Sequence, residues 1–587
     1  MEFNMKTSRL LMLMCLIAFS AMTGCANPNK KQKPKPLEYC FNMVHHNPGE
    51  PLFVTKYVRA DYLKQIGYNG DNPRIYIQCA ITYDKFEPGI VPYESATWAW
   101  IQRCANNLDH IVQEHEEAGL AMYPFTDVLV VPKEVMDKYG NQMKDDNGEL
   151  SIRKPMTQKI IRAQIEEIFR RFPQVDGLTT RFGETYLTDT PFHRGNRPVQ
   201  TMDDHVLLIN ILREEICVKR NKKLFYRTWD FGDLHTNPEN YLKVTDQVEP
   251  HPNLIFMIKH SNNDFVRNVP RNVTLGLGKH RQIVEISLMQ AGCYGKGAYP
   301  YYIGKGVLHG WNELGPDQGI DQLAKDGKIA GVFIWPRGDS WSGPYLSSEF
   351  WPDLNGYIFR EFAKRPWLND QQLFDEYCKK ELKLTKADTE KLYELCLLSA
   401  DATFTGAQSD IIHIRPWWQR DDKLTDIFKL GWWKTSERMI KLDPKDVDHK
   451  ALLEEKAKSV ADWRKIEKLS RQINIPNPED QKYLEVSSTY GRIYFSIIEQ
   501  IWKLSILDLN EGDNANIEQV QKIINEYDRL WNQWFKLECE NPSCATLYMT
   551  CWPQTYPPKW REAPDTKHTK LHHDTPIISK WRKRLPK

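Results

Sequence analysis

The alternation of strand-like runs with helical stretches, from residue 37 to about residue 340, constrains the fold of this chain most. Such an alternation is the pattern of a parallel α/β fold, because parallel strands are joined by crossover helices. The strand-like runs are Leu37–His45, Arg74–Tyr83, Leu120–Val130, Val175–Tyr186, Leu224–Asp230, Leu254–His260, Gln282–Met289 and Ala330–Arg337. Helical patterns lie between most of them, most clearly at Trp98–Ala118 and Thr157–Phe172. Eight such units favour a closed (β/α)8 TIM barrel over an open sheet.

The pattern changes after residue 365, where glycine becomes sparse and long amphipathic stretches follow. These stretches are Asp370–Glu381, Lys386–Ala400, Asp422–Leu442, His449–Gln472, Pro478–Leu509 and Asn516–Lys536. They predict an α-helical C-terminal domain. We therefore divide the chain into a signal peptide (1–25), a linker (26–36), a catalytic barrel (37–365) and a helical domain with an irregular tail (366–587).

The N-terminus has the features of a targeting segment. Lys6 and Arg9 precede the apolar run Leu10–Ala21, which is too short to span a bilayer. The run closes with Met22-Thr23-Gly24-Cys25, which resembles a bacterial lipoprotein signal. We expect export and lipidation at Cys25, so that the N-terminal lipid alone attaches the protein to the outer membrane or cell surface. An ordinary secretory signal with an incidental cysteine is the alternative.

Composition narrows the class of protein. Apolar residues make up 41% and charged residues 27%, as in an ordinary globular protein. The 79 basic and 77 acidic residues leave no basic excess, so we expect no nucleic-acid partner. The 12 cysteines show no zinc-binding spacing, although Cys539, Cys544 and Cys551 are close enough in sequence for a disulfide in an exported protein.

Polar residues gather where the predicted strands end. They are His45, His46, Asp84, Asp127, Arg181, Glu184, Arg227, Asp230, Lys259, His260, Glu285, Arg337 and Asp339. Barrel enzymes place their chemistry at the carboxyl ends of the strands, so this convergence predicts a site there.

Two carboxylates suggest the chemistry. Glu184 ends the fourth predicted strand, and Glu285 lies within the seventh. A carboxylate inside an apolar strand costs stability unless it is paired or functional, and glycoside hydrolysis uses two carboxyl groups that flank the scissile bond. A buried salt bridge with an arginine is the alternative for Glu285.

Several short motifs then follow one another in a recognisable order. They are Tyr226-Arg227-Thr228, Ile258-Lys259-His260-Ser261-Asn262-Asn263-Asp264-Phe265, Val284-Glu285-Ile286, Ser340-Trp341-Ser342-Gly343, Asn355-Gly356-Tyr357 and Arg365-Pro366-Trp367. In order and spacing, the stretch from Leu224 to Glu381 resembles the catalytic domain of the family 67 α-glucuronidases, which also carry a helical domain after a barrel. The chain departs from the family at Thr180, where the family has a lysine.

The resemblance implies roles for individual residues. It makes Glu184 the general acid and leaves Asp264 and Glu285 as candidates for the base. It places Arg227 and Lys259 against the carboxylate of a uronic acid, with Arg181 as a third cation. A structural ion pair is the alternative for each of these cations.

Other strand-end residues complete the candidate site. We expect His45, His260 and Arg337 to contact substrate, with capping as an equal alternative for His45. Trp229, Trp335 and Trp341 are expected to line a sugar site, or else to pack the barrel. We expect no metal and no cofactor.

These observations leave three functional hypotheses. The first is an inverting, α-glucuronidase-like hydrolase that releases a terminal uronic acid from an oligosaccharide or polysaccharide. The second is a retaining glycosidase in which Glu285 is the nucleophile. The third is a non-catalytic glycan-binding lipoprotein. A homodimer through the helical domain is a further hypothesis.

Overall fold

The computed structural model describes most of the barrel and of the helical domain. The described residues are 34–45, 55–73, 76–181, 190–195, 197–229, 233–262, 265, 267, 269–288, 298–315, 317–338, 348–407, 409, 411, 447–544 and 576–585. Several residues singled out above lie outside them, namely Cys25, His46, Glu184, Asp230, Asp264, Asp339 and Trp341.

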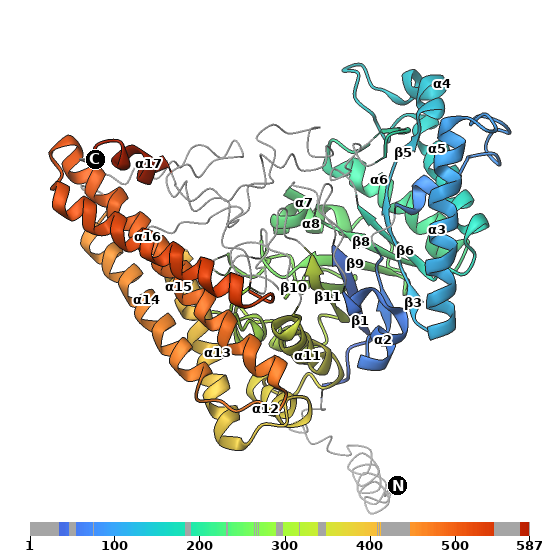
Figure 1. Ribbon diagram of the computed structural model, residues 1–587. Coiled ribbons are helices and arrows are strands. Elements are labelled where there is room, and N and C mark those ends of the chain that lie inside the picture. The colour runs from blue at the N-terminus through green and yellow to red at the C-terminus, as the bar shows by residue number, and fades with distance from the viewer. Residues whose placement is uncertain are drawn as a thin grey trace, which may run out of the picture.

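The barrel is one continuous parallel sheet (Figure 1). Its strands are β1 (Tyr39–His45), β2 (Gly70–Asp71), β3 (Ala121–Met122), β4 (Phe125–Asp127), β6 (Gly177–Arg181), β8 (Lys223–Arg227), β9 (Leu254–Lys259), β10 (Arg281–Ser287) and β11 (Gly331–Gly338). They pair in the order β3-β2-β1-β11-β10-β9-β8-β6-β4. The two outermost strands, β3 and β4, are halves of one stretch interrupted at Tyr123 and Pro124, so the sheet closes on itself through them. The predicted (β/α)8 barrel is thereby confirmed.

One predicted strand is misplaced. The second strand is Gly70–Asp71, whereas the sequence pattern placed it at Arg74–Tyr83. Residues Ile77–Ala80 form a 3-10 helix instead. Pro73 accounts for the early end of the strand, because proline has no N–H to donate to a sheet.

Helices follow the strands and form the outer layer. They are α2 (Ala60–Ile66), α3 (Ala96–Ala118), α4 (Lys133–Met143), α5 (Pro155–Arg171), α6 (Met202–Leu212), α7 (Asp233–Thr236), α8 (Pro238–Thr245), α9 (Gly304–His309), α10 (Asp321–Lys325) and α11 (Phe350–Lys364). Local signals set their ends. The Ser95 side chain caps the first turn of α3, and Gly119 ends the helix with φ of 61°. The antiparallel pair β5 (Val130–Pro132) and β7 (His193–Gly195) lies beside the barrel.

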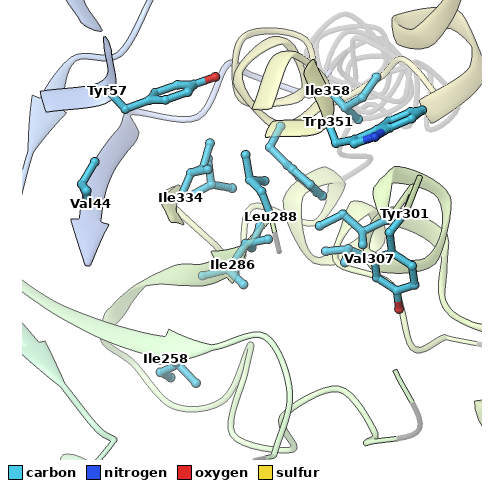
Figure 2. Packing of buried hydrophobic residues seen from close by; sticks show 14 of the residues in the cluster. Val44, Tyr57, Ile258, Ile286, Leu288, Tyr301, Val307, Ile334, Trp351 and Ile358 are labelled. Carbon is cyan, nitrogen blue, oxygen red and sulfur yellow. The ribbon is translucent and has the colours of Figure 1, made fainter. Parts of the chain in front are cut away.

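Successive strand residues face opposite sides, so the barrel has two cores. The outer core joins strand residues such as Ile258, Ile286 and Ile334 to Trp351 and Ile358 of α11 (Figure 2). The inner core fills the barrel with large side chains: Tyr39, Phe41, Met43, Tyr123, Phe125, Phe225, Ile255, Met257, Phe265, Ile283, Phe333 and Trp335. This filling leaves the carboxyl ends of the strands as the place for polar groups.

The C-terminal helices stand beside the barrel (Figure 1). They are α12 (Asp370–Lys380), α13 (Lys386–Ala407), α14 (His449–Ser470), α15 (Pro478–Glu511), α16 (Ile517–Glu540) and α17 (Pro576–Arg582). The predicted helix Asp422–Leu442 lies outside the described residues. No helix within the described ranges is long and apolar enough to cross a membrane. Cys539 and Cys544 are both free thiols, and Cys551 lies outside the described part.

Candidate active site at the carboxyl end of the barrel

Glu285 and Arg227 form an ion pair inside the barrel. Arg227 Nε donates to Glu285 Oε2 at 2.9 Å, and Arg227 Nη2 donates to Oε1 at 2.8 Å. Both residues are shielded from solvent, with exposed fractions of 0% for Glu285 and 3% for Arg227. The pair reaches across β9, because β8 and β10 are its two neighbours in the sheet. A bidentate guanidinium stabilises the ionised carboxylate, which is the form that a base or a nucleophile needs.

Lys259 supplies a second buried cation. Its register partner in β10 is Glu285, so the two side chains face the same interior. The Lys259 ammonium lies 3.4 Å from the centroid of the Trp229 ring and 5.0 Å from that of Phe265. These rings favour a positive charge between them through their π faces. Lys259 is thus held by aromatic groups at a place where a substrate anion would be attracted.

A second ion pair stands at the ends of β4 and β6. Arg181 Nε donates to Asp127 Oδ1 at 2.6 Å, and both residues are buried. Phe125 links the two pairs, since its ring centroid lies 5.7 Å from the Arg181 guanidinium carbon and 5.9 Å from that of Arg227. Trp335 lies 5.6 Å from Arg227 on the other side. Among the described residues, the site thus combines the cations Arg181, Arg227 and Lys259 with the carboxylates Asp127 and Glu285, next to aromatic rings.

The structure brings several of the sequence-predicted residues together. Arg227, Glu285, Lys259, Trp229 and Trp335 are brought together as described above, and Arg181 joins them through Phe125. For His45 and Arg337 the structure describes only the backbone, where both belong to the paired ends of β1 and β11.

His260 differs from its neighbour Lys259. Alternation along the strand directs it to the opposite side, and its backbone N–H continues the ladder by donating to the carbonyl of Glu285 at 2.9 Å. Burial, together with the positive charge of Arg271, lowers the pKa of His260 to about 4. The imidazole is therefore neutral at neutral pH.

Phe265 and His235 also shape this site and were not predicted from the sequence as site residues, while Asp127 was predicted only as a polar strand end. Asp127 binds Arg181, Phe265 covers Lys259, and His235 supports Trp229 with an edge-on contact of 5.3 Å. Asp127 could have been recognised from the sequence as a site residue, because it follows Pro124 within a predicted strand. Phe265 lies in a connecting segment and His235 in the four-residue helix α7, and both stretches are too short or irregular for sequence periodicity to give a side chain its direction.

His235 is fixed by a chain of hydrogen bonds. Asn272 Nδ2 donates to His235 Nε2 at 3.0 Å, and Asn272 Oδ1 accepts from the Thr274 N–H. On the other side of the ring, His235 Nδ1 and Thr228 Oγ1 are hydrogen-bonded at 2.7 Å. Burial lowers the pKa of His235 well below its usual range, with a further contribution from the charges of Lys259 and Arg227. A neutral, fixed ring thus backs the tryptophan that holds Lys259.

Metal chemistry has no visible donor set in the part of the chain that the structure describes. Within these residues, no three or more His, Cys, Asp or Glu side chains are grouped so that they could hold a metal ion. The site offers carboxylates, cations and aromatic rings instead.

Comparisons with known proteins show likeness of structure without likeness of sequence. No protein-family model matches the chain, and a search of curated proteins finds no match. The fold is similar to that of a GH138 enzyme targeting pectin rhamnogalacturonan II, with 12% identity, a TM-score of 0.59, and coverage of 94% of this chain and 84% of that one. It is also similar to the family 89 glycoside hydrolase from Clostridium perfringens in complex with GlcNAc-alpha-1,4-galactose, with 10% identity and a TM-score of 0.51. That match covers 86% of this chain, which spans about half (54%) of the longer enzyme. The chain thus has the fold of these glycoside hydrolases, a TIM-like barrel with a helical domain.

Proposed function

We propose that this protein is a glycoside hydrolase that releases an acidic sugar from a glycan. The observation that carries the proposal is the buried Glu285–Arg227 pair, which lies beside Lys259 at the carboxyl end of the barrel. Burying an ion costs on the order of several kcal/mol of folding free energy. A buried ion pair at the barrel mouth is therefore expected to have a function. The shared fold with glycoside hydrolases of two families supports the same reaction class.

In this proposal Glu285 is the ionised carboxylate of the reaction. The pair with Arg227 holds its charge, and its place on a strand fixes its position better than a loop would. Glu184 is the general acid and Asp264 the second candidate for the base. These two assignments rest on the resemblance to the family 67 α-glucuronidases. The same resemblance supports inversion of configuration and a terminal uronic acid as the sugar that is released.

The two cations are held in different ways. Arg227 is already bonded to Glu285 through two nitrogens. Lys259 is held by rings, and an ammonium so placed can donate to a substrate carboxylate. We assign recognition of the acidic group to Lys259 and Arg227 together, because both cations face the barrel interior beside Glu285.

The test is a panel of acidic oligosaccharides incubated with the wild-type protein and with Glu285→Gln. Release of a uronic acid by the wild type only is the expected result, and NMR of the fresh product should show inverted configuration. Retained configuration would overturn inversion and make Glu285 the nucleophile. Binding of the oligosaccharides without any release would favour the glycan-binding lipoprotein. Cleavage of neutral sugars alone would refute the acidic substrate.

Export and lipidation at Cys25 complete the proposal. The support is the signal-like sequence that ends at Cys25. Cys25→Ser should move the protein from the membrane fraction to the soluble fraction of a bacterial host. Unchanged membrane association would refute the lipid anchor.

A further inference from the structure

The segment after β9 carries one residue into the barrel and another out to the helical domain. The two ends of this segment are joined by the antiparallel bridge between Ser261 and Arg271. A hydrogen bond of 3.0 Å from the Asn262 N–H to the Pro270 carbonyl also joins them. Between these paired ends, Phe265 enters the inner core. It is fully buried, with its ring 5.3 Å from Trp335 and 5.0 Å from the Lys259 ammonium.

Arg267 lies two residues after Phe265, and its side chain binds two carboxylates outside the inner core. Its Nε donates to Glu313 Oε1 at 2.7 Å, and its Nη2 donates to Glu313 Oε2 at 3.1 Å and to Asp401 Oδ1 at 2.7 Å. Glu313 belongs to the 3-10 helix Asn312–Leu314 in the barrel, whereas Asp401 belongs to α13 of the helical domain. One guanidinium thus joins the segment after β9 to both domains.

Aromatic rings on both sides hold the same guanidinium. Its carbon lies 4.3 Å from the ring centroid of Trp311 in the barrel and 4.9 Å from that of Phe404 in α13. Arg267 is buried, and a buried arginine that forms a fork with one carboxylate and a bond with another has little freedom to move.

A second barrel segment attaches to the helical domain in a similar way. Tyr299, which comes after β10, packs against Trp463 of α14 at 5.5 Å and against Phe495 of α15 at 5.3 Å between ring centroids. The helical domain therefore holds segments that follow two neighbouring strands, and these are the strands that carry Lys259 and Glu285.

We propose that the helical domain is a working part of the site and that Arg267 is a positioning residue for Lys259. By fixing Arg267, α13 fixes Phe265 against the Lys259 ammonium and against Trp335. A loosened Phe265 no longer holds its ring against the Lys259 ammonium, so the ammonium spends less time where it can bind a substrate carboxylate. This inference deepens the proposed function and rests on it for its effect on activity.

The test compares two alanine variants of α13 in the full-length protein. Asp401→Ala removes the carboxylate that binds Arg267, and Glu394→Ala removes the one that binds Lys465 of α14 at 2.6 Å. The two carboxylate side chains are similarly exposed, at 54% and 49%, so the variants are matched in helix, charge and exposure. Hydrogen exchange of peptides spanning residues 255–275 and steady-state kinetics on an acidic substrate are the two measurements.

Asp401→Ala should raise exchange in these peptides about tenfold and raise KM for the acidic substrate about tenfold, with a smaller change in kcat. Glu394→Ala should change neither. Unchanged exchange in Asp401→Ala would overturn the coupling, and raised exchange with unchanged KM would overturn the positioning role. If the wild-type protein cleaves no glycan, the proposed function fails, while the exchange measurement still decides whether α13 holds the segment. Arg267→Lys, which keeps the charge but loses the fork, should fall between Asp401→Ala and wild type in both measurements.

Discussion

The barrel mouth and the helical domain bury different kinds of side chain. The barrel mouth buries ions, among them the paired Glu285 and Arg227. The core of the helical domain buries rings, and Trp463 stacks on Phe495 at 4.9 Å with the ring planes 10° apart. Gly491 permits this contact, since a Cβ there would lie 2.3 Å from the Trp463 ring. Ring packing stabilises a fold directly, whereas buried ion pairs stabilise it little and sometimes cost stability.

Charges in the helical domain mostly stay at the surface. Lys458 pairs with Asp462 at 2.7 Å, and Arg471 pairs with Glu467 at 2.8 Å, each across one turn of α14 or its end. Lys456 is one of the exceptions, with 1% of its side chain exposed. Burial lowers the pKa of Lys456, and its ammonium donates to the Thr405 carbonyl at 2.6 Å. The two domains thus differ in how they use buried ions: the barrel mouth groups them on neighbouring strands, whereas Lys456, paired with Glu455 at 2.8 Å, joins α14 to α13.

Glu285→Gln should produce the largest loss of activity. A small loss would contradict the contrast between the buried ions of the barrel mouth and the packed rings of the helical domain. The amide cannot act as a base or nucleophile, so kcat should fall by about 10²–10⁴-fold, as is typical for removal of such a group. Steady-state hydrolysis of an acidic glycan measures it. Glu167→Gln is the matched control, because Glu167 is also buried and bonded to an arginine, Arg170 at 2.6 Å, but lies on α5 outside the barrel. Equal losses in both variants would indicate a structural role for Glu285.

Trp534→Ala tests the contribution of ring packing in the core of the helical domain. Trp534 is buried on α16 and its ring centroid lies 5.5 Å from that of Trp531. Truncation should lower the free energy of unfolding by about 3–5 kcal/mol, because a large cavity replaces the ring. Urea unfolding measures the loss. KM and kcat, taken where the variant is folded, should match the wild type, and a changed KM would show that this distant part of the core also shapes the site.

Lys259→Met should affect recognition more than catalysis. The side chain keeps its packing between Trp229 and Phe265 but loses its charge. Loss of a charged hydrogen bond costs about 1.5–3 kcal/mol, so KM for the acidic substrate should rise by about tenfold or more. The neutral sugar counterpart of the same substrate serves as the control and should lose much less. Equal losses on the two sugars would assign Lys259 to another task.

His309 provides a smaller effect that depends on pH. Its ring lies between Asp321 and Asp370 at 3.2 Å and 3.1 Å, and hydrogen bonds to these carboxylates raise the pKa of His309 to about 9. Because the folded pKa is above the unfolded value, the ion pairs stabilise the fold fully below about pH 6.5, and this stability is lost as the pH rises through about 9. The contribution should be on the order of 2 kcal/mol, judged from the size of the shift. Unfolding of His309→Gln and wild type at pH 6 and pH 10 should differ more at pH 6, and a difference independent of pH would refute the role of the charge.

Lys458→Met should have the smallest effect. Its pair with Asp462 is at the surface of α14 and is screened by water, so the free energy of unfolding should change by less than about 0.5 kcal/mol. The same urea unfolding measures it, with activity unchanged. A loss above about 1 kcal/mol would mean that surface pairs carry more of the stability of this domain than the comparison implies.

The sequence by itself was enough for the fold class and for most of the elements. Apolar periodicity is a local property, so α3, α5, α12, α14 and α15 begin and end close to where the pattern predicted them. The strands that carry Arg227, Lys259 and Glu285 were also predicted, because parallel strands buried on both faces give continuous apolar runs. The second strand was misplaced, since a strand of two residues next to Pro73 has almost no pattern to recognise.

Only the tertiary structure decided which charged groups meet. Arg227 and Glu285 are 58 residues apart and come from strands that flank β9, so their pairing depends on the order and register of the sheet. A shift of one residue in a strand would turn Glu285 or Lys259 toward the helices, because side chains alternate between faces. His260 directly follows Lys259 and was grouped with it from the sequence. Because side chains alternate, His260 is directed to the opposite side of the sheet. Sequence thus determined which residues are available at the barrel mouth, and the register of the strands determined which of them come into contact.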